Sequence, residues 1–179
     1  KKTVGFTFLV DPGKRAYVRR VNVVGNEKTR DVVVRREVRQ VESGWFSGTA
    51  IKRSKNRLEQ LGYFDTVDIT TEPVAGTNDQ LDVAVRVKEK QTGNFTLGAG
   101  FTQGEGFVLS GKVSQANVFG SGNFLSVELN TSKANRVLAL SYVNPYYTVD
   151  GISRGFDLYQ RNTDASKLDK GPYKTQNTG

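Results

Sequence analysis

Few residues of this 179-residue chain could carry out chemistry, because histidine and cysteine are both absent. A Ser-His-Asp triad, an imidazole metal ligand and a reactive thiol are therefore excluded. Asp65 and Asp68 are neighbouring carboxylates, the residue type that general acid–base catalysis uses. They lie where a strand is expected to begin, and solvated surface carboxylates are much commoner there. We therefore predict no catalytic residues and no metal ligands.

The segment "GAGFTQG", residues 98–104, is the one glycine-rich stretch with some likeness to a nucleotide-binding loop. In the G-x-G-x-x-G fingerprint the third glycine opens a helix that binds the pyrophosphate. Here the third glycine comes one residue late, and no helical pattern follows it. We predict no cofactor and no enzymatic activity.

Basic side chains give the chain a net charge of +8 and gather in one region. A solvated helical face is one interpretation, and attraction to membrane head groups or to an acidic partner is another. Nucleic acid is not favoured, since a basic patch is only its electrostatic footprint and the aromatic residues are spread along alternating strands. The cluster consists of Arg35, Arg36, Arg39, Lys52, Arg53, Lys55 and Arg57.

The first half of the chain predicts a β-α-α-β-β unit over residues 15–91. A strand at "YVRRVNVVGN" precedes a helix that Thr29 could cap and that would run through Val41. Val34, Val38 and Val41 would form its apolar stripe. The spacing predicts a second helix from a Thr49 cap to Gly62, with Ile51, Leu58 and Leu61 inward. Alternating strands follow at 63–72 and 80–90.

Residues 1–14 contain a further alternating strand, at 3–10, that has no partner within this unit. It is similar in kind to 81–88, which also ends one unit before another begins. We interpret residues 1–14 as the last strand of a preceding repeat.

Residues 92–179 predict antiparallel strands with one apolar and one small, polar face. A soluble antiparallel sandwich and a partial transmembrane β-barrel both fit this alternation. In a barrel, Lys112, Glu128 and Asp157 would face the lumen, and the remaining strands would lie outside this segment. The expected strands are 94–102, 107–117, 124–132, 136–144 and 152–161.

Aromatic residues recur at the two turns that would face the same side of the membrane as residues 15–91. An aromatic girdle at a membrane interface has this distribution. The predicted interface residues are Phe119, Phe124, Tyr146 and Tyr147.

Three segments of the first half, "VRRVNVVGN", "RREVRQVESGWF" and "RLEQLGYFDTVDI", resemble a POTRA domain. The join to "NPYYTVDG", residues 144–151, resembles the BamA family of outer-membrane β-barrel assembly proteins. The likeness covers nearly the whole chain, from the end of the fourth POTRA domain through the fifth into the first barrel strands. It implies an α+β POTRA domain in the periplasm, followed by antiparallel strands of a partial transmembrane β-barrel in the bacterial outer membrane.

The resemblance also implies a function: a core insertase that folds β-barrel clients and inserts them into the lipid bilayer. It places the docking of outer-membrane lipoproteins on the helix of Arg36, Glu37 and Arg39. An ion pair with arginines of its own helix is the simpler interpretation of Glu37. A protein-exporting transporter of the same superfamily and a soluble periplasmic binding module are the alternatives.

The first barrel strand carries the other implied site, in which its open edge templates a client strand through main-chain hydrogen bonds. Its glycines could instead serve only the curvature of the barrel. The residues of this strand are Asn94, Phe95, Thr96, Leu97, Gly98, Ala99, Gly100, Phe101 and Thr102.

Overall fold

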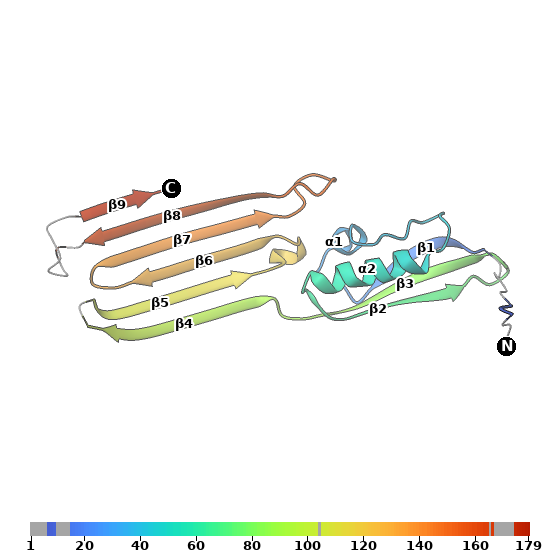
Figure 1. The fold of residues 1–179 in the computed structure, drawn as a ribbon, viewed down its shortest axis with the longest axis horizontal. Coiled ribbons are helices and arrows are strands. Elements are labelled where there is room, and N and C mark those ends of the chain that lie inside the picture. The colour runs from blue at the N-terminus through green and yellow to red at the C-terminus, as the bar shows by residue number, and fades with distance from the viewer. Residues whose placement is uncertain (1–6, 10–14, 104, 165, 167–173) are drawn as a thin grey trace, which may run out of the picture.

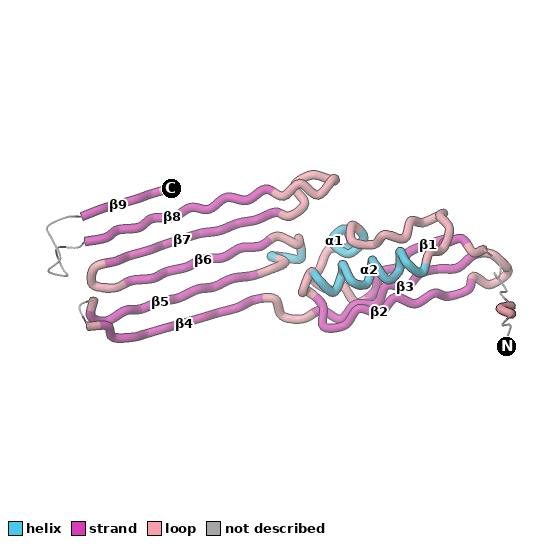
Figure 2. Tube along the Cα trace, in the orientation of Figure 1, coloured by secondary structure: helices cyan, strands magenta, loops and turns pink. Residues whose placement is uncertain are grey.

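The chain forms two parts, a small domain of helices and strands and an antiparallel sheet, which lie end to end (Figure 1). The computed structural model describes residues 7–9, 15–103, 105–164, 166 and 174–179. The strand expected at 3–10 lies, apart from residues 7–9, outside the described residues. Figure 2 shows both α-helices in the N-terminal domain, and one short 3-10 turn at the end of the sheet next to it.

The N-terminal domain has the predicted β-α-α-β-β order. Its three strands form a sheet in the order β1-β3-β2, with β1 parallel and β2 antiparallel to β3. The elements are β1 (Tyr17–Val24), α1 (Asp31–Arg35), α2 (Gly48–Gln60), β2 (Phe64–Pro73) and β3 (Gln80–Glu89).

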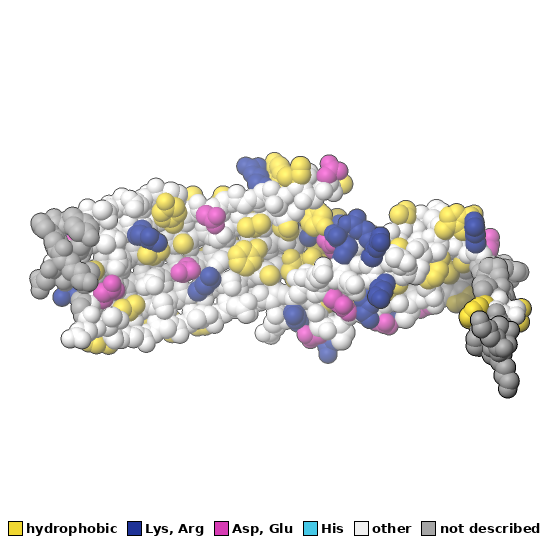
Figure 3. Space-filling view, viewed as in Figure 1, with side chains coloured by type: hydrophobic (Ala, Val, Ile, Leu, Met, Phe, Trp, Pro, Cys, Tyr) yellow, Lys and Arg dark blue, Asp and Glu magenta, His cyan; other side chains and the backbone are white. Residues whose placement is uncertain are grey.

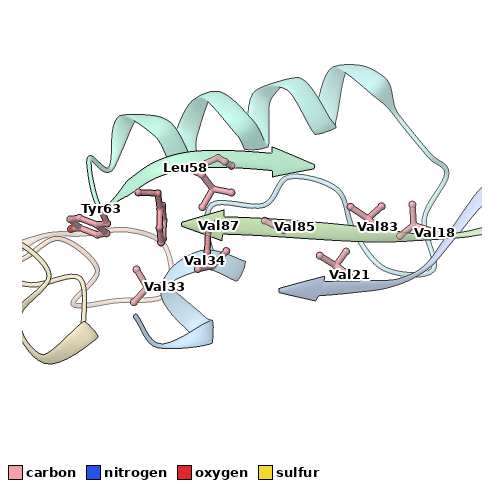
Figure 4. Packing of buried hydrophobic residues seen from close by; sticks show 11 residues of the cluster. Val18, Val21, Val33, Val34, Leu58, Tyr63, Val83, Val85 and Val87 are labelled. Carbon is pink, nitrogen blue, oxygen red and sulfur yellow. The ribbon is translucent and has the colours of Figure 1, made fainter. Parts of the chain in front are cut away.

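The core of this domain lies between the helices and one face of the sheet, as Figure 4 shows. Leu58 of α2, Val34 of α1 and Val85 of β3 are fully buried, as the periodicity predicts. Val38 and Leu61 are partly buried against the same cluster. The other face of the sheet carries exposed ion pairs, such as Arg86 with Glu72 at 2.7 Å, so the domain has a single core.

The first helix is shorter than predicted, and its expected cap at Thr29 is wrong. It ends at Arg35, and Arg30 precedes it without a side-chain cap. Ser54 Oγ accepts a hydrogen bond from the Arg39 backbone N–H at 2.7 Å, which takes a donor that a longer helix would use internally. Val41 consequently lies outside the helix and is 69% exposed.

The cap of the second helix is also different from the prediction. Ser47 rather than Thr49 is the N-cap, and its Oγ accepts from the Ala50 N–H at 3.3 Å. The Gln40 side chain accepts from the Ser47 N–H at 3.0 Å and donates to the Trp45 carbonyl at 2.9 Å. These bonds fix the chain before the helix and place serine at the N-cap, whereas Thr49 lies within the first turn.

Glu89, at the end of β3, binds the loop that connects β1 to α1. Its carboxylate accepts hydrogen bonds from the backbone N–H groups of Thr29, at 2.6 Å, and Lys28, at 3.0 Å. Burial opposes ionisation of Glu89, but the hydrogen bonds from Thr29 and Lys28 outweigh it and lower the pKa below the ordinary value.

We expect Glu89→Gln to destabilise the domain at neutral pH and to flatten its acid unfolding profile. Since the pKa of Glu89 is lowered in the folded state, its contribution is full above its ordinary pKa of 4.5 and is lost as the pH falls through the folded value. Urea unfolding of both proteins at neutral and acid pH measures this. The control is Glu72→Gln, which removes an exposed ion pair that contributes little. Equal pH profiles for wild type and Glu89→Gln would contradict the assignment.

The second part is a six-stranded antiparallel sheet whose spatial order is the order of the sequence. The five predicted strands are present with ends shifted by a few residues, and β9 is an addition. The strands are β4 (Gly93–Thr102), β5 (Gly106–Gln115), β6 (Phe124–Thr131), β7 (Asn135–Asn144), β8 (Arg154–Asp164) and β9 (Lys174–Thr178), with a 3-10 turn, η1 (Val118–Gly120), before β6.

The register of the sheet separates an apolar face from a polar one. Phe95 pairs with Val113, and Val113 pairs with Val127, which aligns apolar side chains across the strands. On the opposite face Lys112 pairs with Glu128, and their charged groups lie 3.5 Å apart. The apolar face stays open to its surroundings, whereas a soluble sandwich would bury it. No helix among the described residues is long and apolar enough to cross a membrane.

Candidate functional site

Strand β4 is an edge strand of the six-stranded sheet. Among the described residues it pairs with β5 alone, from Gly93 opposite Gln115 to Thr102 opposite Gly106 without a register shift. Its nine predicted templating residues, 94–102, all lie in this strand. Its other edge therefore presents backbone donors and acceptors that a further strand could pair with.

The two glycines within β4 have different surroundings. A Cβ atom on Gly98 would lie 2.6 Å from Ser110 Oγ, so the glycine makes room for a cross-strand neighbour. A Cβ atom on Gly100 would meet nothing within 4 Å. Packing thus explains Gly98, whereas at Gly100 the small residue leaves the backbone uncovered.

The turn between β5 and β6 is hydrogen-bonded to the N-terminal domain. Asn117 Nδ2 donates to Thr29 Oγ1 at 2.8 Å, and the Arg30 N–H donates to the Gly120 carbonyl at 2.9 Å. The Tyr63 hydroxyl donates to the Gly122 carbonyl at 3.2 Å. Burial raises the pKa of Tyr63, so its hydroxyl remains protonated as that bond requires.

The turn between β7 and β8 meets the same domain through charged groups. Glu37 is buried, with 3% of the residue exposed, and its carboxylate lies 2.6 Å from Arg57 Nη2. Arg57 donates to the Tyr146 hydroxyl at 3.1 Å, and the Arg36 guanidinium lies 4.1 Å from the centre of the Tyr146 ring. Burial opposes the charge of Arg57, but the hydrogen bond and charge of Glu37 raise its pKa.

The three predicted docking residues are divided between this cluster and the surface. Arg36 and Glu37 lie together, 3.8 Å apart, whereas the Arg39 side chain lines an exposed groove on α2. The groove has a volume of 470 Å³ and also contains Arg53 and Arg57. Figure 3 shows basic side chains gathered in this region of the domain. Contact of these residues with a partner remains a prediction.

The predicted interface aromatics belong to the β5–β6 and β7–β8 turns and to the first residue of β6. Both turns lie at the end of the sheet next to the N-terminal domain (Figure 1). Phe119 is 92% exposed, Tyr147 is 56% exposed and Phe124 is 37% exposed. Tyr146 differs, because it is directed at Arg36 and Arg57. The guanidinium of Arg154 lies 4.9 Å from the Tyr147 ring centre, where it can reach head groups.

The contacts of Asn117, Gly120 and Arg57 between the two parts are absent from the sequence predictions. Asn117 and Thr29 are 88 positions apart, and Arg57 and Tyr146 are 89 apart. Local periodicity contains no signal for such pairs. The density of glycine and asparagine in "NVFGSGN" marks a special turn but not its partner.

Comparisons with known proteins match both parts of the chain. Residues 16–90 match the POTRA family, described as a surface antigen variable number repeat, and residues 117–179 match the Omp85 superfamily domain. The outer membrane protein assembly factor BamA of Neisseria meningitidis serogroup B is 42% identical over 99% of this chain. BamA of Buchnera aphidicola is 38% identical over 82% of this chain. The chain spans 23% and 24% of the lengths of these relatives.

Solved structures agree with this relationship. BamA from Haemophilus ducreyi lacking POTRA domains 1-3 superposes with a TM-score of 0.81 and 35% identity, covering 93% of this chain and 31% of that one. CdiB from Acinetobacter baumannii has a TM-score of 0.59 at 17% identity, covering 90% of this chain and 32% of that one, which shows a shared fold alone.

The predicted location follows from the same relatives. BamA homologues are outer-membrane proteins, and their POTRA domains lie in the periplasm. The six-stranded antiparallel sheet has a BamA barrel-domain neighbour among solved structures, and it does not close into a barrel within this segment. The chain is therefore a homologue of BamA over nearly its whole length, with a match to the POTRA family that is followed by a match to the Omp85 superfamily domain.

Proposed function

We propose that this chain is part of an insertase that folds β-barrel proteins and inserts them into the outer membrane. The observation that carries the proposal is the position of β4. It is the first strand of the membrane sheet, next to the POTRA domain, and among the described residues one of its edges has no partner strand. An incoming client strand needs only main-chain partners, and an edge strand supplies them in a regular row.

The two faces of the sheet suit this activity. Phe95, Leu97 and Phe101 are 71%, 66% and 81% exposed on the face assigned to lipid. The opposite face carries the Lys112–Glu128 pair and would line a hydrated lumen. A client paired to β4 would thus extend both the apolar and the polar surface. Its own folding free energy drives insertion, so the proposed activity is not enzymatic and needs no cofactor.

The POTRA domain would recruit the accessory partners. Outer-membrane lipoproteins are proposed to dock on the face of this domain that carries Arg36, Glu37 and Arg39. Arg39 is exposed there, whereas Glu37 is buried and would affect docking only through the arginines that it pairs with. The neighbouring groove of Arg39, Arg53 and Arg57 gives this surface a positive charge. Such charge steers association with a partner whose surface is acidic.

A photo-crosslinking residue at Leu97 of β4 tests the edge directly in the full-length protein. We expect crosslinks from Leu97 to folding clients, because a templated strand lies immediately beside β4. Leu138 of β7 is the matched control, since it is also an apolar residue of the outer face and is 49% exposed. It lies on an interior strand that pairs with neighbours on both sides, so few crosslinks are expected there.

The result that would overturn the proposal is normal client assembly without crosslinks at Leu97, or with equal crosslinks at both positions. A second measurement uses the full-length protein with β4 locked by an engineered disulfide to the last barrel strand. Client assembly should stop in the locked protein and return when the bond is reduced. Undiminished assembly with the seam fully crosslinked would leave the glycines of β4 as curvature devices.

A further inference from the structure

We infer that Glu37 is the buried anchor of a clamp between the POTRA domain and the turn that joins β7 to β8. The clamp consists of Glu37, Arg36, Arg57 and Tyr146. Glu37 acts in it as a positioning residue, since it reaches the membrane sheet only through the two arginines. This inference concerns the orientation of the two parts and holds whether or not the sheet inserts clients.

The Glu37 carboxylate is the centre of the clamp. Its side chain is 4% exposed, and its oxygens lie 2.6 Å from Arg57 Nη2 and 3.8 Å from Arg36 Nε. A carboxylate removed from water is costly unless paired charges and hydrogen bonds compensate it. Glu37 therefore requires both arginines, and each arginine is held in place by the same carboxylate.

Tyr146 is the residue of the sheet part that the two arginines of the clamp contact. Its hydroxyl accepts from Arg57 at 3.1 Å, while its ring lies beneath the Arg36 guanidinium at 4.1 Å. A cation over an aromatic face is attracted by the ring quadrupole. Among the described residues, no other hydrogen bond or ion pair joins the turn at 145–151 to the POTRA domain. This turn is thus attached by a single side chain.

Arg36 connects the clamp to the other turn. Its Nε and Nη2 atoms are buried without a hydrogen-bond partner, so the nearby Glu37 charge and the Tyr146 ring must compensate the cation. A Cβ atom on Gly122 would lie 2.4 Å from Arg36 Nη2. The guanidinium therefore fits between the two turns, and removal of the Glu37 charge would leave it buried and uncompensated.

The two contacts of the POTRA domain with the sheet have different chemistry. The turn at 116–123 is held by neutral hydrogen bonds of Asn117, Gly120 and Gly122. The turn at 145–151 is held by charges that centre on Glu37. Loss of the Glu37 charge should therefore release the second turn while the first contact persists, and the POTRA domain should lose its fixed angle to the sheet.

Electron–electron distance measurements on the full-length protein in lipid test this inference. This segment contains no cysteine, so spin labels can be placed at Lys55→Cys on α2 and Asp150→Cys in the turn, both exposed positions. We expect one narrow distance peak in the otherwise unchanged protein and its loss in Glu37→Gln. Tyr146→Phe keeps the ring but removes the hydroxyl, so it should broaden the peak less than Glu37→Gln does.

Two control variants distinguish loss of the clamp from a general effect of replacing a glutamate or a tyrosine. Glu72→Gln removes an exposed pair with Arg86, on a face of the POTRA sheet that does not contact the turn. Tyr147→Phe changes the neighbouring tyrosine, which lies beside Arg154 instead. Both should retain the narrow peak. Should Glu37→Gln fail to fold, Tyr146→Phe tests the clamp by itself.

An unchanged narrow peak in folded Glu37→Gln would overturn the inference. If Glu37→Gln does not fold, an unchanged narrow peak in Tyr146→Phe would overturn it. Co-purification of the lipoproteins distinguishes the clamp from direct docking. If Glu37→Gln loses the partners while its distance peak stays narrow, Glu37 acts at the docking surface and the clamp is refuted. If the peak is lost, the clamp stands irrespective of the partners.

Discussion

Replacing Leu58 with alanine should lower the free energy of unfolding of the POTRA domain by about 2–5 kcal/mol. Leu58 is fully buried between α2 and the sheet, against valines of α1 and β3. The substitution removes apolar contacts and leaves a cavity that the surrounding valines fill only partly. Chemical denaturation followed by circular dichroism measures the loss.

Val41→Ala is the matched control for this prediction. It also shortens an apolar side chain of the same domain, but Val41 lies between the two helices and is 69% exposed. Its effect should stay within about 0.5 kcal/mol, as for most surface substitutions. Similar losses for the two variants would show that the core does not lie where the structure places it.

Gly120→Ala should separate the turn at 116–123 from the POTRA domain. Gly120 has a φ of +70°, and a Cβ atom there would lie 1.8 Å from the Lys28 carbonyl oxygen. Two backbone segments cannot both stay in place at that distance. The variant should therefore lose the bond from the Arg30 N–H to the Gly120 carbonyl, which exists only while the two segments touch.

Gly76→Ala controls for the strain of the backbone alone. Gly76 has a φ of +82°, but a Cβ atom there would meet nothing within 4 Å. Both variants should share a cost of about 1–2 kcal/mol for a left-handed alanine. Gly120→Ala should lose about 1–3 kcal/mol more, from the broken hydrogen bonds of the junction.

Amide hydrogen exchange over residues 25–36 provides the direct measurement for this pair. Exchange at Arg30 should accelerate in Gly120→Ala and remain unchanged in Gly76→Ala. Equal protection of Arg30 in both variants would mean that the turn is not fixed to the domain through Gly120.

The strands could be predicted from the sequence because a pleated strand exposes alternate residues to two environments. The alternation of Phe95, Leu97 and Phe101 predicted β4 in this way, and the inward residues Val34 of the first helix and Leu58 of the second predicted the core. Strand β9, "KTQNT", has no such contrast, because all of its side chains are polar. The end of α1 was missed since Ser54 and Gln40, from outside the helix, bind the backbone that follows it.

The two candidate sites differ in how far they depend on residues that are distant in the sequence. The templating edge was predicted on β4 from the family resemblance and stays a prediction, while β4 itself, which lies at the edge of the described sheet, followed from the alternation of its side chains. The burial of Glu37 could not be predicted from the sequence, since it depends on Arg57 of α2 and on Tyr146, which is distant in the sequence. A charged residue just after a short helix is ordinarily solvated, whereas Glu37 is buried beside Arg36 and Arg57.

The neighbour-to-neighbour order of β4 to β9 has a consequence for the rate and course of folding. Each of these strands pairs with the one just synthesised before it, so every new pairing closes only a short loop. Contacts of such low sequence separation form quickly and can be added one at a time. In the POTRA domain, by contrast, β1 pairs with β3, for example Tyr17 with Gln80, and both helices lie between these strands in the sequence. This pairing therefore cannot form before β3 is available. We expect the POTRA domain to fold in one cooperative step, whereas the membrane sheet grows stepwise and has a free growing edge at every stage of its own assembly.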